Sequence, residues 1–150
     1  MRIYLAVIDE TEEARAALRF ASRRAAKTGG AVQILALVPK QDFSAFGAIQ
    51  ATMEDEARDR AEAIATSAAG SLFSESGKMP KIAVRTGAGQ EVIRDYLAEN
   101  SEIAALVLGA APEGNPGPLV SHFAANVGAL PCPLFIVPGA LSDEELDRLS

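Results

Sequence analysis

The sequence is poor in the residues that build covalent or metal-linked frameworks. Its 150 residues include one cysteine, one histidine and no tryptophan, and aromatic residues make up 5% of the chain. A disulfide needs two cysteines, and a zinc site of cysteine and histidine needs several such ligands, so neither is expected. The single cysteine, Cys132, lies between two prolines and is expected to be a buried small hydrophobe. With few aromatic rings and abundant alanine, the core is predicted to be mostly aliphatic.

Basic residues and long apolar runs are also scarce. Lys and Arg number 14 against 20 Asp and Glu, and the net charge of −6 argues against a nucleic-acid partner. The longest apolar run, Ile103–Pro112, is much shorter than the roughly 18 residues of a membrane span, so no membrane partner is expected. The first apolar run meets Asp9 too early for the core of a signal peptide. We therefore expect a cytoplasmic protein.

What the sequence does contain is typical of a folded domain, with 49% hydrophobic and 23% charged residues. Five apolar runs predict strands that are covered on both faces. These runs are Ile3–Ile8, Ala31–Val38, Lys81–Arg85, Ile103–Leu108 and Leu134–Val137. Between them, helical spacing of apolar residues occurs at residues 12–28, 50–73, 90–100 and 119–130, and residues 39–49 form a loop-rich insertion.

This alternation of strands and helices predicts an α/β fold. It favours a doubly wound five-stranded parallel sheet with helices on both faces. The strand orders 3-2-1-4-5 and 2-1-3-4-5 both agree with right-handed crossovers. Because neither an internal repeat nor a linker is evident, residues 1–150 are predicted to form a single domain. The tail Leu141–Ser150 is predicted to add one amphipathic turn through Leu146 and Leu149.

The first predicted helix has clear end signals. Thr11 is a candidate N-cap, and Gly29-Gly30 can close the helix. The basic residues of the last turn, Arg23, Arg24 and Lys27, complement the helix dipole. We interpret them as a solvated face rather than a basic binding site.

The predicted topology places three residues near one another. Ligands of doubly wound sheets bind beyond the carboxyl ends of the strands, where the strand order reverses. With the order 3-2-1-4-5, this point lies between strands 1 and 4. Asp9 and Gly109, at the ends of those strands, are then expected close to Val38 at the end of strand 2. Each also has a structural interpretation, because Asp9 suits a turn, Gly109 a tight turn and Val38 the end of a core strand.

Motifs for several other chemistries are absent. The segment after strand 1, Asp9–Glu13, carries carboxylates that would repel a pyrophosphate instead of a G-x-G-x-x-G motif. Ser121 and His122 are neighbours on a predicted helix and do not face each other, so no Ser/His/Asp triad is expected. A phosphate-accepting receiver domain needs Asp after strand 3 and Lys after strand 5, where this chain has Thr86-Gly87 and Pro138-Gly139. With no evident general base or cationic clamp, the chain is predicted not to be an enzyme.

Five segments have a characteristic order and spacing. They are Leu5-Ala6-Val7-Ile8-Asp9, Leu37-Val38-Pro39, Gly87 before the third helix, the run Ala104–Gly109 and the run Pro131–Val137. Together they resemble the universal stress protein family over nearly the whole chain. The resemblance implies the strand order 3-2-1-4-5 and a homodimer that forms through the last strand, Leu134–Val137.

One branch of that family binds ATP through the motif G-x2-G-x9-G-[ST] after strand 4. Gly109 matches the first glycine and Ser121 the final hydroxyl residue, but Pro112 and Val120 replace the other two glycines. Ser121 lies 12 positions after Gly109, where the motif requires 14. The prolines of this segment have no N–H for a phosphate, and Gly109–Ser121 contains no Lys or Arg. The resemblance therefore implies a degenerate phosphate loop.

The residues that bind adenosine in the family's site match this sequence better than those of the phosphate loop. Asp9 matches the family residue that accepts hydrogen bonds from the ribose hydroxyls, and Val38 matches the residue that packs near adenine. The candidate cofactor-binding residues are Asp9, Val38, Gly109 and Ser121, with ATP as the ligand to be tested. No metal site and no other cofactor are expected.

Three functional hypotheses follow. The first is a homodimeric stress-response module that binds ATP weakly or not at all. The second is an ATP-binding regulatory protein that uses the crevice between strands 1 and 4. The third is an interaction protein that uses the edge of the last strand and the Phe43–Phe46 loop, which either folds back on the core or forms a lid.

Overall fold

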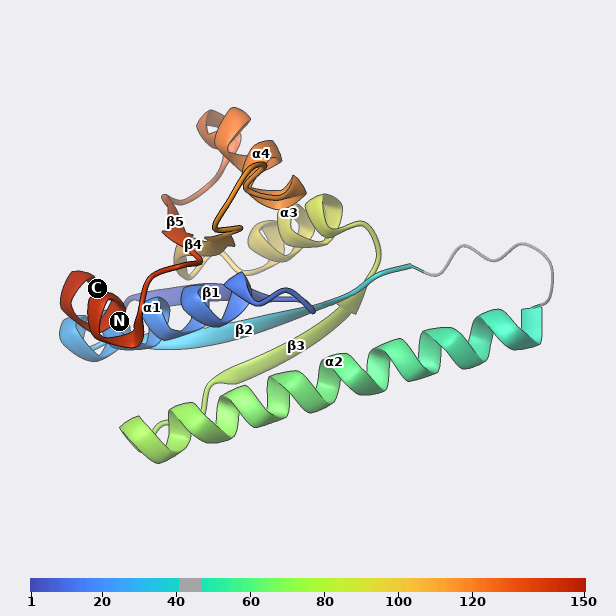
Figure 1. Cartoon of the computed structure of the whole chain (residues 1–150), viewed down its shortest axis with the longest axis horizontal. Coiled ribbons are helices and arrows are strands. Elements are labelled where there is room, and N and C mark those ends of the chain that lie inside the picture. The colour runs from blue at the N-terminus through green and yellow to red at the C-terminus, as the bar shows by residue number, and fades with distance from the viewer. Residues whose placement is uncertain (41–46) are drawn as a thin grey trace.

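The computed structural model describes residues 1–40 and 47–150, so the Phe43–Phe46 loop lies outside the described residues. Within them, five strands form one parallel sheet of order 3-2-1-4-5 (Figure 1). The strands are β1 (Ile3–Ile8), β2 (Ala31–Val38), β3 (Lys81–Thr86), β4 (Ile103–Ala110) and β5 (Leu134–Pro138). The helices are α1 (Glu13–Thr28), α2 (Gly47–Ser76), α3 (Gly89–Glu99), α4 (Pro118–Ala125) and α5 (Asp143–Leu149). The predicted doubly wound α/β fold is confirmed.

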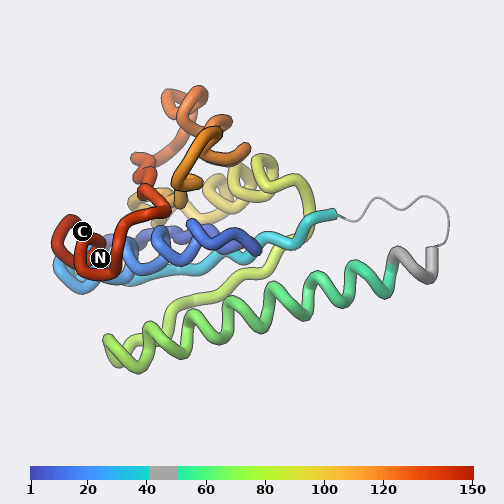
Figure 2. Tube along the Cα trace, in the orientation of Figure 1, coloured from blue at the N-terminus to red at the C-terminus, as the bar shows by residue number. Residues whose placement is uncertain are grey.

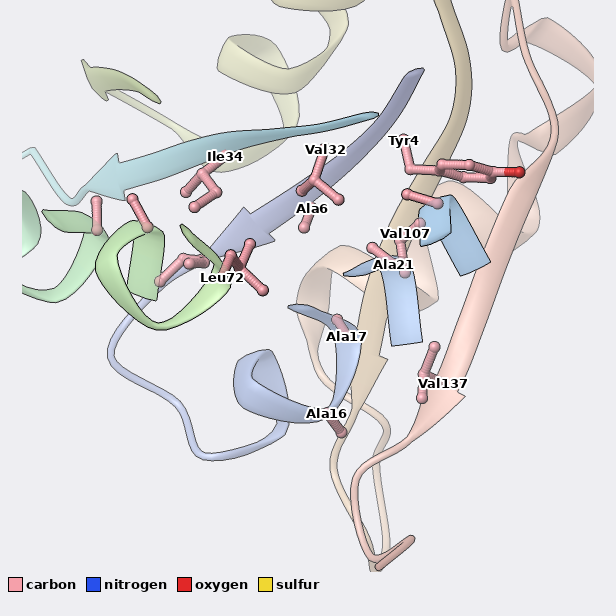
Figure 3. Close-up of a cluster of buried hydrophobic side chains, with 14 of the residues drawn as sticks. Tyr4, Ala6, Ala16, Ala17, Ala21, Val32, Ile34, Leu72, Val107 and Val137 are labelled. Atoms are coloured by element: carbon pink, nitrogen blue, oxygen red, sulfur yellow. The ribbon is translucent and has the colours of Figure 1, made fainter. Parts of the chain in front are cut away.

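Helices cover both faces of the sheet. On one face, α1, α2 and α5 pack on a cluster of buried residues, and Figure 3 shows Ala6 and Val107 of the sheet near Ala17 and Ala21 of α1. On the other face, α3 and α4 cover a second cluster. The short alanine side chains allow α1 to lie close to the strands. Both clusters are mainly aliphatic, as the composition predicts.

The helix α2 is longer than the predicted segment 50–73. It spans Gly47–Ser76, so part of the predicted insertion 39–49 is helical. Its later turns pack against β2 and β3 (Figure 2). Its end is set by Gly77, which adopts a left-handed φ of 72° and donates its N–H to the Phe73 carbonyl at 2.8 Å. No helix in the described part of the chain is long and apolar enough to cross a membrane.

The prediction of a helix over residues 119–130 is wrong at its C-terminal end. The helix α4 stops at Ala125, and a 3₁₀ turn follows at Val127–Ala129. The side-chain and backbone N–H groups of Asn126 both donate to the His122 carbonyl, at 2.7 and 3.1 Å. This competition for a helical carbonyl ends the helix, and Val127 is exposed rather than buried.

Of the two predicted ends of α1, only the C-terminal end agrees with the structure. Gly29 closes the helix in a left-handed conformation, with φ of 66°, as predicted. Thr11 does not cap the other end, because its hydroxyl and its N–H both donate to the Asp9 carboxylate. Glu12 takes the N-cap position without a side-chain hydrogen bond.

The C-terminal tail forms a helix of seven residues rather than a single turn. A capping box begins α5, in which the Ser142 hydroxyl accepts the Glu145 N–H at 3.2 Å and the Glu145 carboxylate accepts the Ser142 N–H at 3.1 Å. Leu146 of α5 is buried in the core cluster, whereas Leu149 is exposed. The amphipathic character predicted for the tail therefore rests on Leu146.

The interpretation of the basic residues of α1 as a solvated face is wrong. Arg23 and Lys27 bind α5, and Arg24 lies over the Phe135 ring at 5.3 Å. A hydrogen bond from Arg19 lowers the pKa of Asp147 on α5 below its ordinary value. The cations of α1 therefore hold the C-terminal helix.

A buried hydrogen bond between Tyr96 and Gln33 gives a stability prediction. The Tyr96 hydroxyl donates to Gln33 Oε1 at 2.9 Å, and burial raises the pKa of Tyr96, which keeps this donor protonated. Tyr96→Phe leaves the Gln33 oxygen unsatisfied and is expected to lower the free energy of unfolding by about 1–3 kcal/mol in urea denaturation. Tyr4→Phe is the control. The Tyr4 hydroxyl bonds the Thr28 hydroxyl at a partly buried position, so a smaller loss of stability is expected. Equal losses in both variants would contradict this account.

Candidate functional site

A small crevice lies at the carboxyl ends of β1 and β4, where the strand order reverses. Its volume is about 120 Å³, and it is lined by the end of β1, the start of α1, the end of β4 and the loop before α4. Asp9 and Gly109 both line it, so the structure brings these two predicted residues together. Pockets for small molecules usually have volumes of about 300–1,000 Å³, so this crevice is small for a nucleotide.

Asp9 forms a turn at the mouth of the crevice. Its Oδ1 accepts the Thr11 N–H at 2.9 Å and also the Thr11 hydroxyl. This arrangement is an Asx turn, which the residue after a strand commonly forms. Asp9 Oδ2 accepts no hydrogen bond from the described residues. One carboxylate oxygen is therefore engaged in the turn, and the other could accept a hydrogen bond from a ligand hydroxyl.

Gly109 is required by packing. A Cβ atom at this position would lie 2.0 Å from the Glu13 carbonyl oxygen, so only glycine lets the end of β4 touch the start of α1. Gly139, after β5, has the same role, because its Cβ would lie 2.5 Å from the Ala110 carbonyl oxygen and 2.8 Å from Glu13 Cβ. The structural interpretation of Gly109 thus has a direct physical basis, independent of any ligand.

The loop between β4 and α4 uses its own hydrogen-bond donors. The Ala111 N–H donates to the Pro116 carbonyl at 3.1 Å, and the Gly117 N–H donates to Asn115 Oδ1 at 2.8 Å. Pro112, Pro116 and Pro118 have no N–H. Two donors are therefore occupied and three positions have none, in the segment that would have to surround a phosphate.

The other two candidate residues do not line the crevice. Ser121 is exposed on α4, where its hydroxyl lies 3.4 Å from Asn115 Oδ1 and its N–H donates to the Gly117 carbonyl. Val38 is fully buried, and its carbonyl accepts the Gly87 N–H at 3.1 Å. Asp9 and Gly109 thus line the crevice together, whereas Val38 ends the neighbouring strand β2 beside β1 without lining the crevice.

The charges in the crevice are of one sign. Asp9 and Glu13 are among its lining residues, and none of the described residues that line it is Lys, Arg or His. Such a lining can accept hydrogen bonds from sugar hydroxyls but repels a phosphate. It also offers no evident general base with a cation to stabilise a developing charge.

Sequence reasoning missed two residues that shape this region, Asn115 and Gly139. The segment Asn115-Pro116-Gly117 is a turn signal, and the amide side chain of Asn115 organises the loop. Gly139 directly follows a strand that neighbours β4, so its position beside Gly109 could be anticipated from the strand order. Both signals were present in the sequence, but their contacts depend on tertiary structure.

Cys132 lies away from the crevice, before β5. It is half-buried against the second core cluster, and burial raises the pKa of its thiol. A raised pKa leaves little reactive thiolate at neutral pH, which agrees with a packing role.

Comparisons with known proteins agree with this architecture. The model of the universal stress protein family matches residues 1–138, and no curated protein matches the chain at a significant level. Universal stress protein UspA from Lactobacillus plantarum has a similar solved structure, with a TM-score of 0.78, 19% identity and coverage of 91% of this chain and 97% of that one.

Two other solved relatives hold adenine nucleotides. An Arabidopsis thaliana protein of the universal stress protein family with AMP bound has a TM-score of 0.60 and 14% identity, and the match covers 96% of this chain and 95% of that one. A universal stress protein in complex with cAMP has a TM-score of 0.63 and 16% identity, with 91% and 96% covered. The TM-scores establish the shared fold, although the sequence identities are low. With its family match over residues 1–138 and its 3-2-1-4-5 sheet, the chain belongs to the universal stress protein family.

Proposed function

We propose that the chain is a homodimeric stress-response module that binds ATP weakly or not at all and has no enzymatic activity. The observation that carries this proposal is the loop between β4 and α4. Its N–H groups at Ala111 and Gly117 are occupied within the protein, and three prolines remove further donors.

The energetic consequence is large. A hydrogen bond to a charged group contributes about 1.5–3 kcal/mol, so losing three of them weakens phosphate binding by roughly a thousandfold or more. The carboxylates of Asp9 and Glu13 oppose a phosphate further, and the crevice volume of about 120 Å³ is small for a whole nucleotide. These effects act in the same direction.

Purification gives a simple test of this proposal. The chain has no tryptophan and two tyrosines, so a bound nucleotide would dominate its absorbance at 260 nm relative to 280 nm. We expect the purified protein to show no nucleotide in its spectrum and to release none on heat denaturation. A stoichiometric adenine nucleotide, identified by mass spectrometry, would contradict the proposal.

The second candidate function is an ATP-binding regulatory protein. It is favoured by the solved relatives that hold AMP and cAMP, and by the second oxygen of Asp9, which has no partner among the described residues. This function predicts that Asp9→Ala weakens nucleotide binding at least ten-fold in a calorimetric titration. Glu10→Ala is the matched control, because Glu10 pairs with Arg60 outside the crevice. Equal binding by wild type and Asp9→Ala would refute it.

The homodimer is proposed to form through β5. This edge strand carries no charged residue, and its Leu134 and Phe135 are half-buried while Ile136 is exposed. The opposite edge strand, β3, carries Lys81 and Arg85, which oppose edge-to-edge pairing. Pairing two copies of β5 about a two-fold axis would cover the uncharged edge.

A further inference from the structure

The helix α1 carries four cations on one face. Arg15, Arg19, Arg23 and Lys27 are spaced four residues apart, so they lie along one side of the helix. Figure 1 shows α5 lying beside α1, although the two helices are far apart in the sequence. We name these four residues the α1 basic face.

Each member of this face binds α5 or its end, through carboxylates of Asp143 and Asp147 or through main-chain oxygens. Arg15 Nη2 lies 3.1 Å from Asp143 Oδ1. Arg19 donates to both oxygens of Asp147 at 2.9 Å, and Arg23 donates to the same carboxylate at 3.0 Å. This bidentate and shared geometry is characteristic of specific arginine–carboxylate recognition.

The last cation holds the end of the helix. Lys27 Nζ donates to the Asp147 carbonyl at 2.6 Å and to the Ser150 carbonyl at 3.0 Å. Between the charges, Leu146 is 1% exposed in the core cluster beneath α1. The α1 basic face therefore binds the carboxylates and the last main-chain carbonyls of the short acidic helix α5, whose one buried leucine lies in the core.

The contacts that hold α5 would allow another helix to displace it. Within α5, Leu146 is the buried residue. The Arg15–Asp143 pair is open to solvent, with side chains 75% and 48% exposed, and the Arg19, Arg23 and Asp147 side chains are partly exposed, at 25%, 32% and 39%. Exposed pairs are screened by salt. The family match ends at residue 138, so α5 follows the part of the chain that the family shares. A helix held in this way can leave while the sheet stays intact.

We propose that the α1 basic face is a docking site for a short acidic helix of a partner protein, and that α5 is the resident occupant which the partner displaces. Charge complementarity supports this occupant. Removal of α5 leaves four cations, and among the described residues outside α5 only Glu75 on α2 forms ion pairs with them, through Arg19 and Arg23. A groove of about 630 Å³ between α1 and α2 continues from the site past Leu18 and Ile64, which gives room for a longer helix.

Hydrogen exchange of the full chain tests whether α5 can leave. We expect the amides of Glu145–Leu149 to exchange at least a hundredfold faster than those of β1 and β4, and faster still when NaCl is raised from 0.05 to 0.5 M. Exchange of α5 only together with the sheet, without a salt effect, would overturn the proposal, because it would make α5 a fixed part of the fold.

A peptide tests whether the uncovered face binds an acidic helix. The probe is a synthetic peptide with the sequence of residues 141–150, titrated by NMR into the full chain with Leu146→Ala and Asp147→Ala in its own α5. We expect shifts at Arg15–Lys27, with binding at least ten-fold tighter than to wild type and a Kd below about 1 mM. Arg19→Ala with Arg23→Ala should abolish it, as should Leu146→Ala in the peptide.

The outcomes that overturn the proposal are distinct. Absence of peptide binding to a variant that keeps its circular dichroism would show that the face does not recognise a separate helix. If the variant with both Leu146→Ala and Asp147→Ala fails to fold, the same titration is made with the Asp147→Ala variant alone. A dimer in light scattering that Leu146→Ala abolishes and Ile136→Asp leaves intact would assign the face to a second copy of this chain.

Discussion

Gly109→Ala is expected to lower the free energy of unfolding by about 3 kcal/mol, the upper part of the range for overpacking. The new Cβ atom would lie 2.0 Å from the Glu13 carbonyl oxygen and 2.6 Å from its carbon, so backbone must move. For a chain of this length, that loss corresponds to a fall in Tm of roughly 6–12 °C. Thermal unfolding followed by circular dichroism measures it without any ligand.

Gly70→Ala provides the matched control. Gly70 lies inside α2, and a Cβ atom there would meet no heavy atom within 4 Å. Because alanine favours the helix over glycine, this variant is expected to be more stable by about 0.5–1 kcal/mol. If Gly109→Ala were as stable as wild type, the glycine would not be explained by packing, and a role in ligand binding would become the better account.

Ile136→Asp is expected to convert the proposed dimer into a monomer. A charge at the centre of the uncharged β5 edge would face its own copy across a two-fold axis, and like charges opposite each other oppose strand pairing. Multi-angle light scattering should give twice the chain mass of 15.7 kDa for wild type and the single chain mass for the variant. We expect the dimer affinity to fall at least a hundredfold.

The same substitution on the opposite edge is the control. Ile82 on β3 is 36% exposed, close to the 42% of Ile136, so Ile82→Asp introduces an equal charge at similar exposure. We expect this variant to remain a dimer. Monomeric wild type, or a loss of the dimer in Ile82→Asp alone, would contradict the assignment of the interface to β5.

Most of the fold could be predicted because the signals are local and repeated. Five apolar runs separated by helical patterns lead to a doubly wound sheet, and the resemblance selected the observed strand order. The errors lie at element ends, where side chains compete for backbone groups. Asn126 ends α4 early, and Asp9 draws Thr11 away from its capping position.

The candidate site was harder to predict because it depends on contacts between distant segments. The topology brings Asp9 and Gly109 together, as expected, but it gives no measure of how deeply Val38 is buried. Similarly, the spacing of the cations on α1 was visible in the sequence. Their binding to α5 could not be predicted. It depends on Leu146, which packs near α1 although it lies more than 100 residues later in the sequence.

Titration calorimetry that compares ATP–Mg²⁺ with adenosine, both in the same Mg²⁺ buffer, tests the central claim most directly, because the two ligands then differ only in the phosphates and the Mg²⁺ that they bind. The account predicts that ATP binds no more tightly than adenosine and that both have a Kd weaker than about 1 µM. ATP binding at micromolar affinity or tighter, with adenosine at least about 100-fold weaker, would show that the loop after β4 holds phosphates. That result would contradict the account.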